Sequence, residues 1–128
     1  MNMPNPDARS ERVFKTAWFS KAARKARILD AELCAAIRQV MLGQADDLGG
    51  GVYKKRLGRN LFRSILVAKG GRFWVYAYLF AKKDRANIGV DELADFRALA
   101  DLYVRKTDAE IVKELQLKEI VEICHGEE

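Results

Sequence analysis

The chain has few of the residues on which most catalytic centres depend. Its 128 residues include one histidine and two cysteines. A Ser-His-Asp triad cannot be assembled around His125 at the C-terminal end, and a structural zinc site usually takes four ligands, whereas Cys34, Cys124 and His125 supply three. We therefore expect no bound metal and no cofactor, and we set acyl transfer aside.

Long apolar runs are missing as well. No stretch approaches the ~18 consecutive apolar residues of a membrane span. The first residues, which include Pro4, Pro6 and Asp7, lack the apolar run of a signal peptide. We expect a soluble, cytoplasmic protein without membrane contacts. Because two cysteines in that compartment are more often free than bridged, Cys34 and Cys124 are predicted to form no disulfide.

Charge is divided unevenly along the chain. Residues 1–90 contain 18 Lys and Arg against 7 Asp and Glu, a net charge of +11, whereas residues 91–128 contain 5 against 11, a net charge of −6. A positive field of this size attracts polyanions. Nucleic acid is therefore the natural partner of the basic part, and a basic surface that serves solubility alone is the alternative.

Capping residues predict a strand and two helices in the N-terminal part. A short strand at 11–15 precedes a helix at about 16–27, for which Thr16 offers the N-cap. Asp30 is predicted to cap a second helix, which ends near Gly43, a glycine suited to a left-handed C-cap.

A three-stranded antiparallel meander is predicted in the middle of the chain. The glycine-rich segment 46–51 suits a loop, and β-branched and aromatic residues then dominate the runs 52–57, 62–69 and 72–80. Gly70-Gly71 is the strongest hairpin signal. Because the last run is apolar on both faces, we expect a central strand that helices cover on at least one side.

The C-terminal part is predicted to be acidic and helical. Asp91 is the expected cap of a third helix, and Thr107 with Glu110 forms a capping box that opens a fourth. Residues 117–123 could extend that helix or form an edge strand, and the pattern does not decide between the two.

Together these elements predict one α+β domain. An N-terminal strand and two helices pack on the antiparallel meander, and C-terminal helices follow. At 49% hydrophobic residues, the chain can fill one modest core. We divide it into a flexible tail at 1–10, a main part at 11–105 and an acidic C-terminal helical extension at 106–128.

Basic residues gather at one end of the predicted meander. Neighbouring antiparallel strands lie ~4.8 Å apart, so cations on one face of adjacent strands converge. Lys54 and Arg56 share a face of the first strand, and Lys55 takes the other. Further cations begin the second strand or follow the third: Arg63, Lys82, Lys83 and Arg85.

Such a cluster can cut RNA without a metal or a histidine. RNA carries its own nucleophile, the 2′-OH, so cleavage needs a base, charge stabilisation at the phosphate and a proton for the leaving 5′-oxygen. A lysine among other cations can lose its proton and act as the base, whereas an arginine stays charged and holds the phosphate. Lys21, Arg24 and Lys25 form a second basic face on the first helix, for RNA binding or for solvation alone.

Four stretches of the sequence form a recognisable set. They are Val13-Phe14-Lys15-Thr16-x-Trp18-Phe19, Gly49-Gly50-Gly51-Val52-x-Lys54-Lys55-Arg56, Phe62-Arg63 and Phe80-Ala81-Lys82-x-x-Arg85-x-Asn87-Ile88. Together they resemble a RelE/HigB-like branch of the toxins of type II toxin–antitoxin systems, over about residues 12–105. Members of that family often carry a longer Gly-Lys-Ser-Gly-Gly loop before the arginine, which here is the short Gly58-Arg59-Asn60-Leu61.

The resemblance implies a RelE-like α+β fold and an mRNA interferase, an endoribonuclease that cleaves mRNA without a metal, commonly on the ribosome. A cognate antitoxin, in this branch usually a helix-turn-helix DNA-binding protein, would neutralise it. Matched residue by residue, the candidate catalytic residues are Lys54, Arg56, Arg63 and Lys82. Lys54 or Lys82 would be the general base, and the two arginines would stabilise the phosphate charge.

The remaining candidates are assigned to RNA binding. Tyr78 could stack on a base, and the others would contact the RNA backbone: Lys55, Lys83, Arg85, Lys21, Arg24 and Lys25. Two other functions stay open. One is a ParE-like toxin, which shares this fold but inhibits DNA gyrase without catalysis, and the other is a plain nucleic-acid-binding module.

Overall fold

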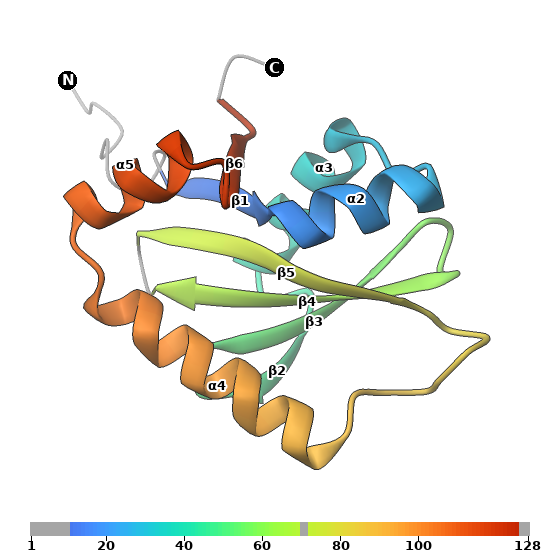
Figure 1. Ribbon diagram of the computed structural model, residues 1–128. Coiled ribbons are helices and arrows are strands. Elements are labelled where there is room, and N and C mark those ends of the chain that lie inside the picture. Colours follow the sequence, from blue (N-terminus) through green and yellow to red (C-terminus); the bar gives the residue numbers. More distant parts are fainter. Residues whose placement is uncertain (1–10, 70–71, 126–128) are drawn as a thin grey trace, which may run out of the picture.

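The computed structural model describes residues 11–69 and 72–125, which form a six-stranded sheet with helices on both faces (Figure 1). The strands are β1 (Arg12–Thr16), β2 (Asp46–Gly49), β3 (Val52–Leu57), β4 (Phe62–Lys69), β5 (Phe73–Ala81) and β6 (Ile120–Ile123). The helices are α2 (Ala17–Ala26), α3 (Asp30–Met41), α4 (Val90–Arg105) and α5 (Asp108–Gln116). The predicted α+β class is confirmed. The predicted tail at 1–10 and the Gly70-Gly71 turn lie outside the described residues.

The strand order is β2-β3-β4-β5-β1-β6, so β5 is internal as predicted. β1 runs parallel to β5, and the other neighbouring pairs are antiparallel. The predicted meander is β3-β4-β5, and the open alternative for 117–123 is settled by the edge strand β6. The prediction of a loop at 46–51 was wrong, because Asp46 and Asp47 pair with β3 as the short edge strand β2.

Glycine is required where β2 turns into β3. Gly49, Gly50 and Gly51 have φ angles of +84°, +65° and +82°, in the left-handed region that other residues rarely adopt. A Cβ atom on Gly50 would lie 2.8 Å from Cγ of Arg97, whose side chain covers the turn from α4. The glycine run therefore lets α4 pack closely on the sheet.

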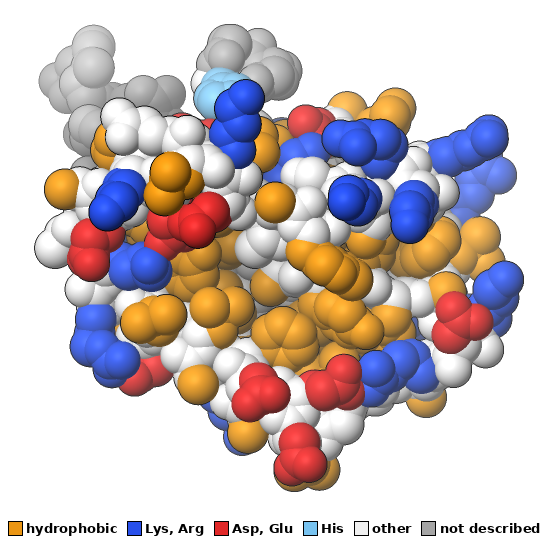
Figure 2. All heavy atoms as spheres, viewed as in Figure 1, with side chains coloured by type: hydrophobic (Ala, Val, Ile, Leu, Met, Phe, Trp, Pro, Cys, Tyr) orange, Lys and Arg blue, Asp and Glu red, His pale blue; other side chains and the backbone are white. Residues whose placement is uncertain are grey.

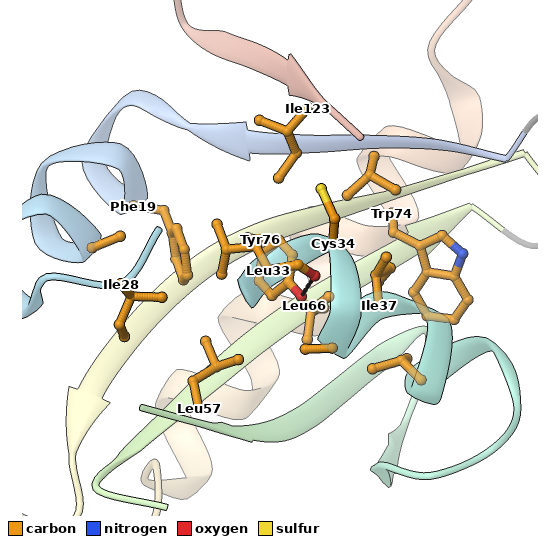
Figure 3. Packing of buried hydrophobic residues seen from close by; sticks show 14 of the residues in the cluster. Phe19, Ile28, Leu33, Cys34, Ile37, Leu57, Leu66, Trp74, Tyr76 and Ile123 are labelled. Atoms are coloured by element: carbon orange, nitrogen blue, oxygen red, sulfur yellow. Dashed lines mark hydrogen bonds between the residues drawn. The ribbon is translucent and has the colours of Figure 1, made fainter. Parts of the chain in front are cut away.

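Alternating side chains along the strands form two cores, one on each face of the sheet. On β1, Val13 joins the core under α2 and α3, and Phe14 joins the core under α4 and α5. Figure 3 shows the first of these cores, in which the buried Tyr76 donates its hydroxyl hydrogen to the Leu33 carbonyl at 2.8 Å. The helices thus cover β5 on both faces, which confirms the prediction for that strand.

Two helices begin as the sequence predicts. The Thr16 hydroxyl accepts a hydrogen bond from the Phe19 backbone N–H at 3.0 Å and caps α2. At α5, the Glu110 N–H donates to Thr107 Oγ1 at 3.2 Å and the Thr107 N–H donates to the Glu110 carboxylate at 2.8 Å. Gly43 has a φ of +87° just after α3, as expected. No helix in 11–69 or 72–125 has the length and apolar character to cross a membrane.

Two other helix starts were predicted wrongly. α3 begins at Asp30 itself, so the preceding residue holds the N-cap position. The Asp30 carboxylate does not cap the helix because it pairs with Lys15 Nζ at 2.7 Å. α4 begins one residue before Asp91, and its N-cap is Gly89, whose N–H donates to the Glu92 carboxylate at 2.7 Å. The carboxylate of Glu92, rather than that of Asp91, thus accepts the hydrogen bond of the free N–H group at the start of α4.

Cys34 and Cys124 form a disulfide, contrary to the prediction of free thiols. Their Cα atoms lie 5.5 Å apart, although the residues are 90 positions apart in sequence. Cys34 lies on α3 in the first core, and Cys124 directly follows β6. The prediction rested on an assumed reducing compartment, and nothing in the local pattern indicated that these two segments meet.

Reducing the Cys34–Cys124 disulfide should lower the free energy of unfolding by roughly 2–4 kcal/mol, because the bond closes a long loop in the unfolded chain. Urea denaturation with and without dithiothreitol measures the difference. The Cys34→Ser/Cys124→Ser double variant is the control and should not respond to the reductant. Identical curves for the wild type in both buffers would contradict the prediction.

An ion pair also fastens β6 to β1. Arg12 donates hydrogen bonds from Nε and Nη2 to the two carboxylate oxygens of Glu122, both at 2.8 Å. The hydrogen bond from Arg12 lowers the pKa of Glu122 below its ordinary value of 4.5, and partial burial opposes this effect. A carboxylate whose pKa falls on folding stabilises the folded state above its unfolded pKa, and this contribution is lost as the pH falls through the folded pKa.

Glu122→Gln should therefore destabilise the protein near neutral pH, by up to about 1 kcal/mol for a partly exposed pair. The difference from the wild type should disappear below the lowered pKa of Glu122, where the wild-type carboxyl is protonated too. Urea denaturation across this pH range measures it. Glu119→Gln, at an exposed position, is the matched control. A difference that stays constant with pH would refute the role of this pair.

Candidate functional site

Two rows of side chains cross the sheet on the face that α4 partly covers. In the first row Arg56 on β3 lies opposite Arg63 on β4, which lies opposite Phe80 on β5. In the second row Lys54 lies opposite Ile65, which lies opposite Tyr78. Directly opposed residues have Cβ atoms about 4.5–5.5 Å apart, so the structure brings three predicted cations together with the predicted tyrosine.

A bulge in β5 decides which aromatic side chains reach this face. Ile65 pairs with Tyr78 and the next residue, Leu66, pairs with Tyr76, so Ala77 is an extra residue in β5. Tyr76 belongs to the core under α2 and α3, whereas Tyr78 packs against the core under α4. In a regular strand residues two apart share a face, so the bulge turns Tyr78 and, two residues later, Phe80 toward the site.

Arg56 and Arg63 are two cations in direct cross-strand opposition. Like charges placed in this way destabilise a sheet. Arg63 Nη1 donates to the carbonyl oxygens of Asn60 and Phe62, both at 3.1 Å, which directs its guanidinium toward the β3–β4 turn. Within the described residues, neither arginine has a carboxylate within ion-pair distance. The pair is therefore suited to an external anion such as a phosphate.

Lys54 and Lys55 point to opposite faces of β3 and have different surroundings. Lys54 Nζ lies 3.8 Å from the Asp46 carboxylate, and its side chain is 15% exposed. Lys55 Nζ donates to the Gln44 carbonyl at 2.8 Å. Burial, and to a lesser degree the charge of Arg56, lowers the pKa of Lys55. Both lysines line a hollow of about 270 Å³ at the edge of the sheet.

The cations after β5 divide into two kinds. Lys82 and Lys83 are exposed in a turn, and the Lys82 N–H donates to the Leu61 carbonyl at 2.9 Å, which ties this turn to the β3–β4 loop. Arg85 forms an ion pair with Glu92, and this hydrogen bond raises the pKa of Arg85. Its guanidinium also lies 5.5 Å from the ring centroid of Phe80. Arg85 thus has a structural partner, whereas Lys82 is exposed and follows Phe80, the residue opposite Arg63, by two positions.

The three cations predicted to form one basic face on α2 lie in two different surroundings. Lys21 and Lys25 follow Trp18 at i+3 and i+7, so these three side chains share one stripe. Arg24 lies on the other side, where it lines a hollow of about 560 Å³ together with Lys15, Ser20, Arg27 and Asp30. The lysines and the arginine therefore face different surroundings.

Three aromatic residues at the site, Trp18, Phe80 and Phe96, were missed in the sequence analysis. The Tyr78 ring is stacked against Trp18, with ring centroids 4.9 Å apart and an interplanar angle of 26°. It also contacts Phe96 of α4 at 5.8 Å and Phe80 at 6.0 Å. Figure 2 shows the hydrophobic side chains in a concave area between α2 and α4, with Lys and Arg side chains over α2 beside them. In the sequence, Trp18 lies off the apolar stripe of its helix, and this position was the one available indication that its side chain lies outside the core.

This face can bind an anion next to flat apolar groups, which is the combination that single-stranded nucleic acids require. In the part of the chain that the structure describes, no group of three or more His, Cys, Asp or Glu is placed to hold a metal ion. His125 is exposed after β6, away from the rows described above.

Comparison with protein families identifies the fold and the class of protein. Residues 11–123 match the family described as the RelE toxin of the RelE / RelB toxin-antitoxin system. No curated protein and no solved structure matched the chain. The match extends past α5 and includes β6. The family pattern therefore continues beyond residue 105, where the motif resemblance ends. The chain therefore belongs to the RelE toxin family and is a toxin of a toxin–antitoxin system.

Proposed function

We propose that this toxin is an endoribonuclease that cleaves mRNA, an mRNA interferase, with its active site on the face of β3, β4 and β5. The observation that carries the proposal is the cross-strand pair of Arg56 and Arg63, which lacks a carboxylate partner in the described residues. Lys54 and Lys82 flank the pair. Three or four cations around one position match a phosphate that gains negative charge during cleavage.

The reaction requires no group other than side chains and RNA. The base takes the proton of the 2′-OH, the 2′-oxygen attacks the adjacent phosphorus, and the bond to the 5′-oxygen breaks. The leaving 5′-oxygen takes a proton from solvent, to which the base later gives the proton that it removed, so the products are a 2′,3′-cyclic phosphate and a 5′-hydroxyl. Arg56 and Arg63 stabilise the additional charge on the phosphate oxygens in the transition state.

Lys82 is the better candidate for the general base. Lys54 is shielded and lies beside the Asp46 carboxylate, with which a substrate phosphate has to compete. Lys82 is exposed and has no carboxylate partner in the described part of the chain. A general base has to reach the 2′-OH next to the bound phosphate, and an exposed lysine without an ion-pair partner can do so. Lys54 then contributes to phosphate binding.

Basic residues outside the arginine pair would bind the RNA chain. Lys83 lies next to Lys82, and Lys21 and Lys25 lie on the α2 stripe that borders the aromatic residues. We include the ribosome among the partners because members of the resembled branch commonly act there. The cognate antitoxin is proposed to be a helix-turn-helix DNA-binding protein on the same ground, and a small reading frame of that type next to this one would support it.

Arg56→Ala and Arg63→Ala should each lower the cleavage rate about 100-fold or more, because each removes a donor that stabilises transition-state charge. The rate is measured on single-stranded RNA and on mRNA of translating ribosomes under single-turnover conditions. Arg38→Ala on the outer surface of α3 is the matched control and should cleave at the wild-type rate. RNA ending in a 2′,3′-cyclic phosphate is expected, and RNA with 2′-O-methyl groups should resist.

Lys82→Ala should lower the cleavage rate by two or more orders of magnitude, as expected on loss of a general base, and Lys54→Ala should lower it by about tenfold. The pH–rate profile separates the two roles. The rise of the rate with pH should be lost in Lys82→Ala and kept in Lys54→Ala. The reverse pattern would assign the base to Lys54.

Two outcomes would overturn the ribonuclease proposal. Inhibition of DNA gyrase in a supercoiling assay, with RNA left intact, would indicate a ParE-like toxin. Tight and strongly salt-dependent RNA binding without cleavage, on free RNA and on ribosomes alike, would indicate a nucleic-acid-binding module.

A further inference from the structure

Trp18 is the outermost of a group of aromatic rings at the edge of the site. It is the second residue of α2, and it is 52% exposed. Its indole stacks on Tyr78, and Tyr78 contacts Phe80 and Phe96 behind it. The Tyr78 ring therefore has protein on several sides, whereas the indole of Trp18 has a ring behind it and solvent in front.

We propose that Trp18 is the platform on which one nucleobase of single-stranded RNA stacks, with Tyr78 and Phe96 supporting it from behind. This inference rests on the proposed function for the identity of the ligand. A half-exposed tryptophan on a rigid stack offers a flat apolar surface at little entropic cost. Base–aromatic stacking of this kind tolerates every base, because each has a π-face.

The position of Trp18 relative to the cations favours RNA as the occupant. Tyr78, under the indole, lies in the row next to the one that holds Phe80, Arg63 and Arg56. Two residues along a strand span about 7 Å, so the stack adjoins the proposed scissile phosphate. A base on Trp18 thus belongs to a nucleotide close to the cleavage point.

The helix that carries Trp18 supplies charges for the RNA backbone. Lys21 and Lys25 share the Trp18 stripe, and both are exposed. Figure 2 shows Lys and Arg side chains over α2 directly beside the concave hydrophobic area. A flat apolar surface next to a row of cations is the pattern that binds single strands.

Tryptophan fluorescence gives a direct test that does not require cleavage. The chain has two tryptophans, and Trp74 is 9% exposed, lies in the core under α2 and α3 and donates to Glu11 at 3.0 Å. Emission that responds to a ligand on the site face therefore comes from Trp18. The probe is a short 2′-O-methyl oligoribonucleotide, which lacks the free 2′-OH and stays intact.

The oligonucleotide should quench part of the Trp18 emission, and an abasic oligonucleotide with the same number of phosphates should not. Trp18→Ala should bind the intact oligonucleotide about tenfold more weakly or worse, and Trp18→Phe should keep most of the affinity. Leu42→Ala, which removes an exposed apolar side chain at the end of α3, is the matched control and should bind as the wild type does.

Either of two outcomes would overturn the proposal that Trp18 is a stacking platform. One is equal quenching of its emission by the abasic strand, and the other is an unchanged RNA affinity in Trp18→Ala. Unchanged RNA affinity together with weaker neutralisation by the antitoxin would assign Trp18 to the antitoxin interface instead. If Trp18→Ala does not fold, Trp18→Phe and the abasic comparison still decide the question. Base-dependent quenching without any RNA cleavage would keep the platform and refute the ribonuclease, so the two proposals fail separately.

Discussion

The register of β3, β4 and β5 is the constraint on which the whole site depends. It places Arg56 opposite Arg63 and Lys54 in the same row as Tyr78. Because side chains alternate between the faces of a strand, a slip of one residue would move the cations to the face under α2 and α3. The hydrophobic residues between the cations prevent such a slip, since Ile65 and Leu66 are fully buried in opposite cores.

One part of the β3–β4–β5 face is buried under α4 and stabilises the fold, and the other part is exposed and carries the candidate site. Where α4 crosses the sheet, its side chains cover the strands, and Arg97 holds the glycine turn between β2 and β3. Beyond the reach of α4 the sheet carries charged side chains on the same face. The two like charges of Arg56 and Arg63 cost stability in the free protein. A phosphate between them removes that cost, which favours binding of an anion at this position.

The C-terminal segment is attached to the fold in two independent ways. Arg12 and Glu122 link β1 to β6 through two hydrogen bonds, and the disulfide links the residue after β6 to α3. β6 is an edge strand with a single neighbour, so its pairing with β1 alone provides little stability. The end of the acidic part of the chain, β6, is therefore a structural part of the sheet, at the edge opposite β2.

Local sequence pattern determined the elements of this protein and the residue types of its site. The spacing of β-branched and aromatic residues predicted β3, β4 and β5 to within one residue, and the capping residues Thr16, Thr107 and Glu110 act as expected. Strand alternation predicted that Lys54 and Arg56 share a face. Motif resemblance supplied the family, because its residues lie in consecutive stretches that can be read without a fold.

Only the tertiary structure decided the features that join distant segments. The bulge at Ala77 reverses the faces of β5 and brings Tyr78 to the site. Because residues 73–81 are all apolar or aromatic, their pattern does not indicate which residue is the extra one. Trp18 reaches Tyr78 because α2 packs on β5, and Cys34 meets Cys124 because β6 pairs with β1 beside α3. Propensity and periodicity act over a few residues, whereas these contacts depend on how whole elements pack.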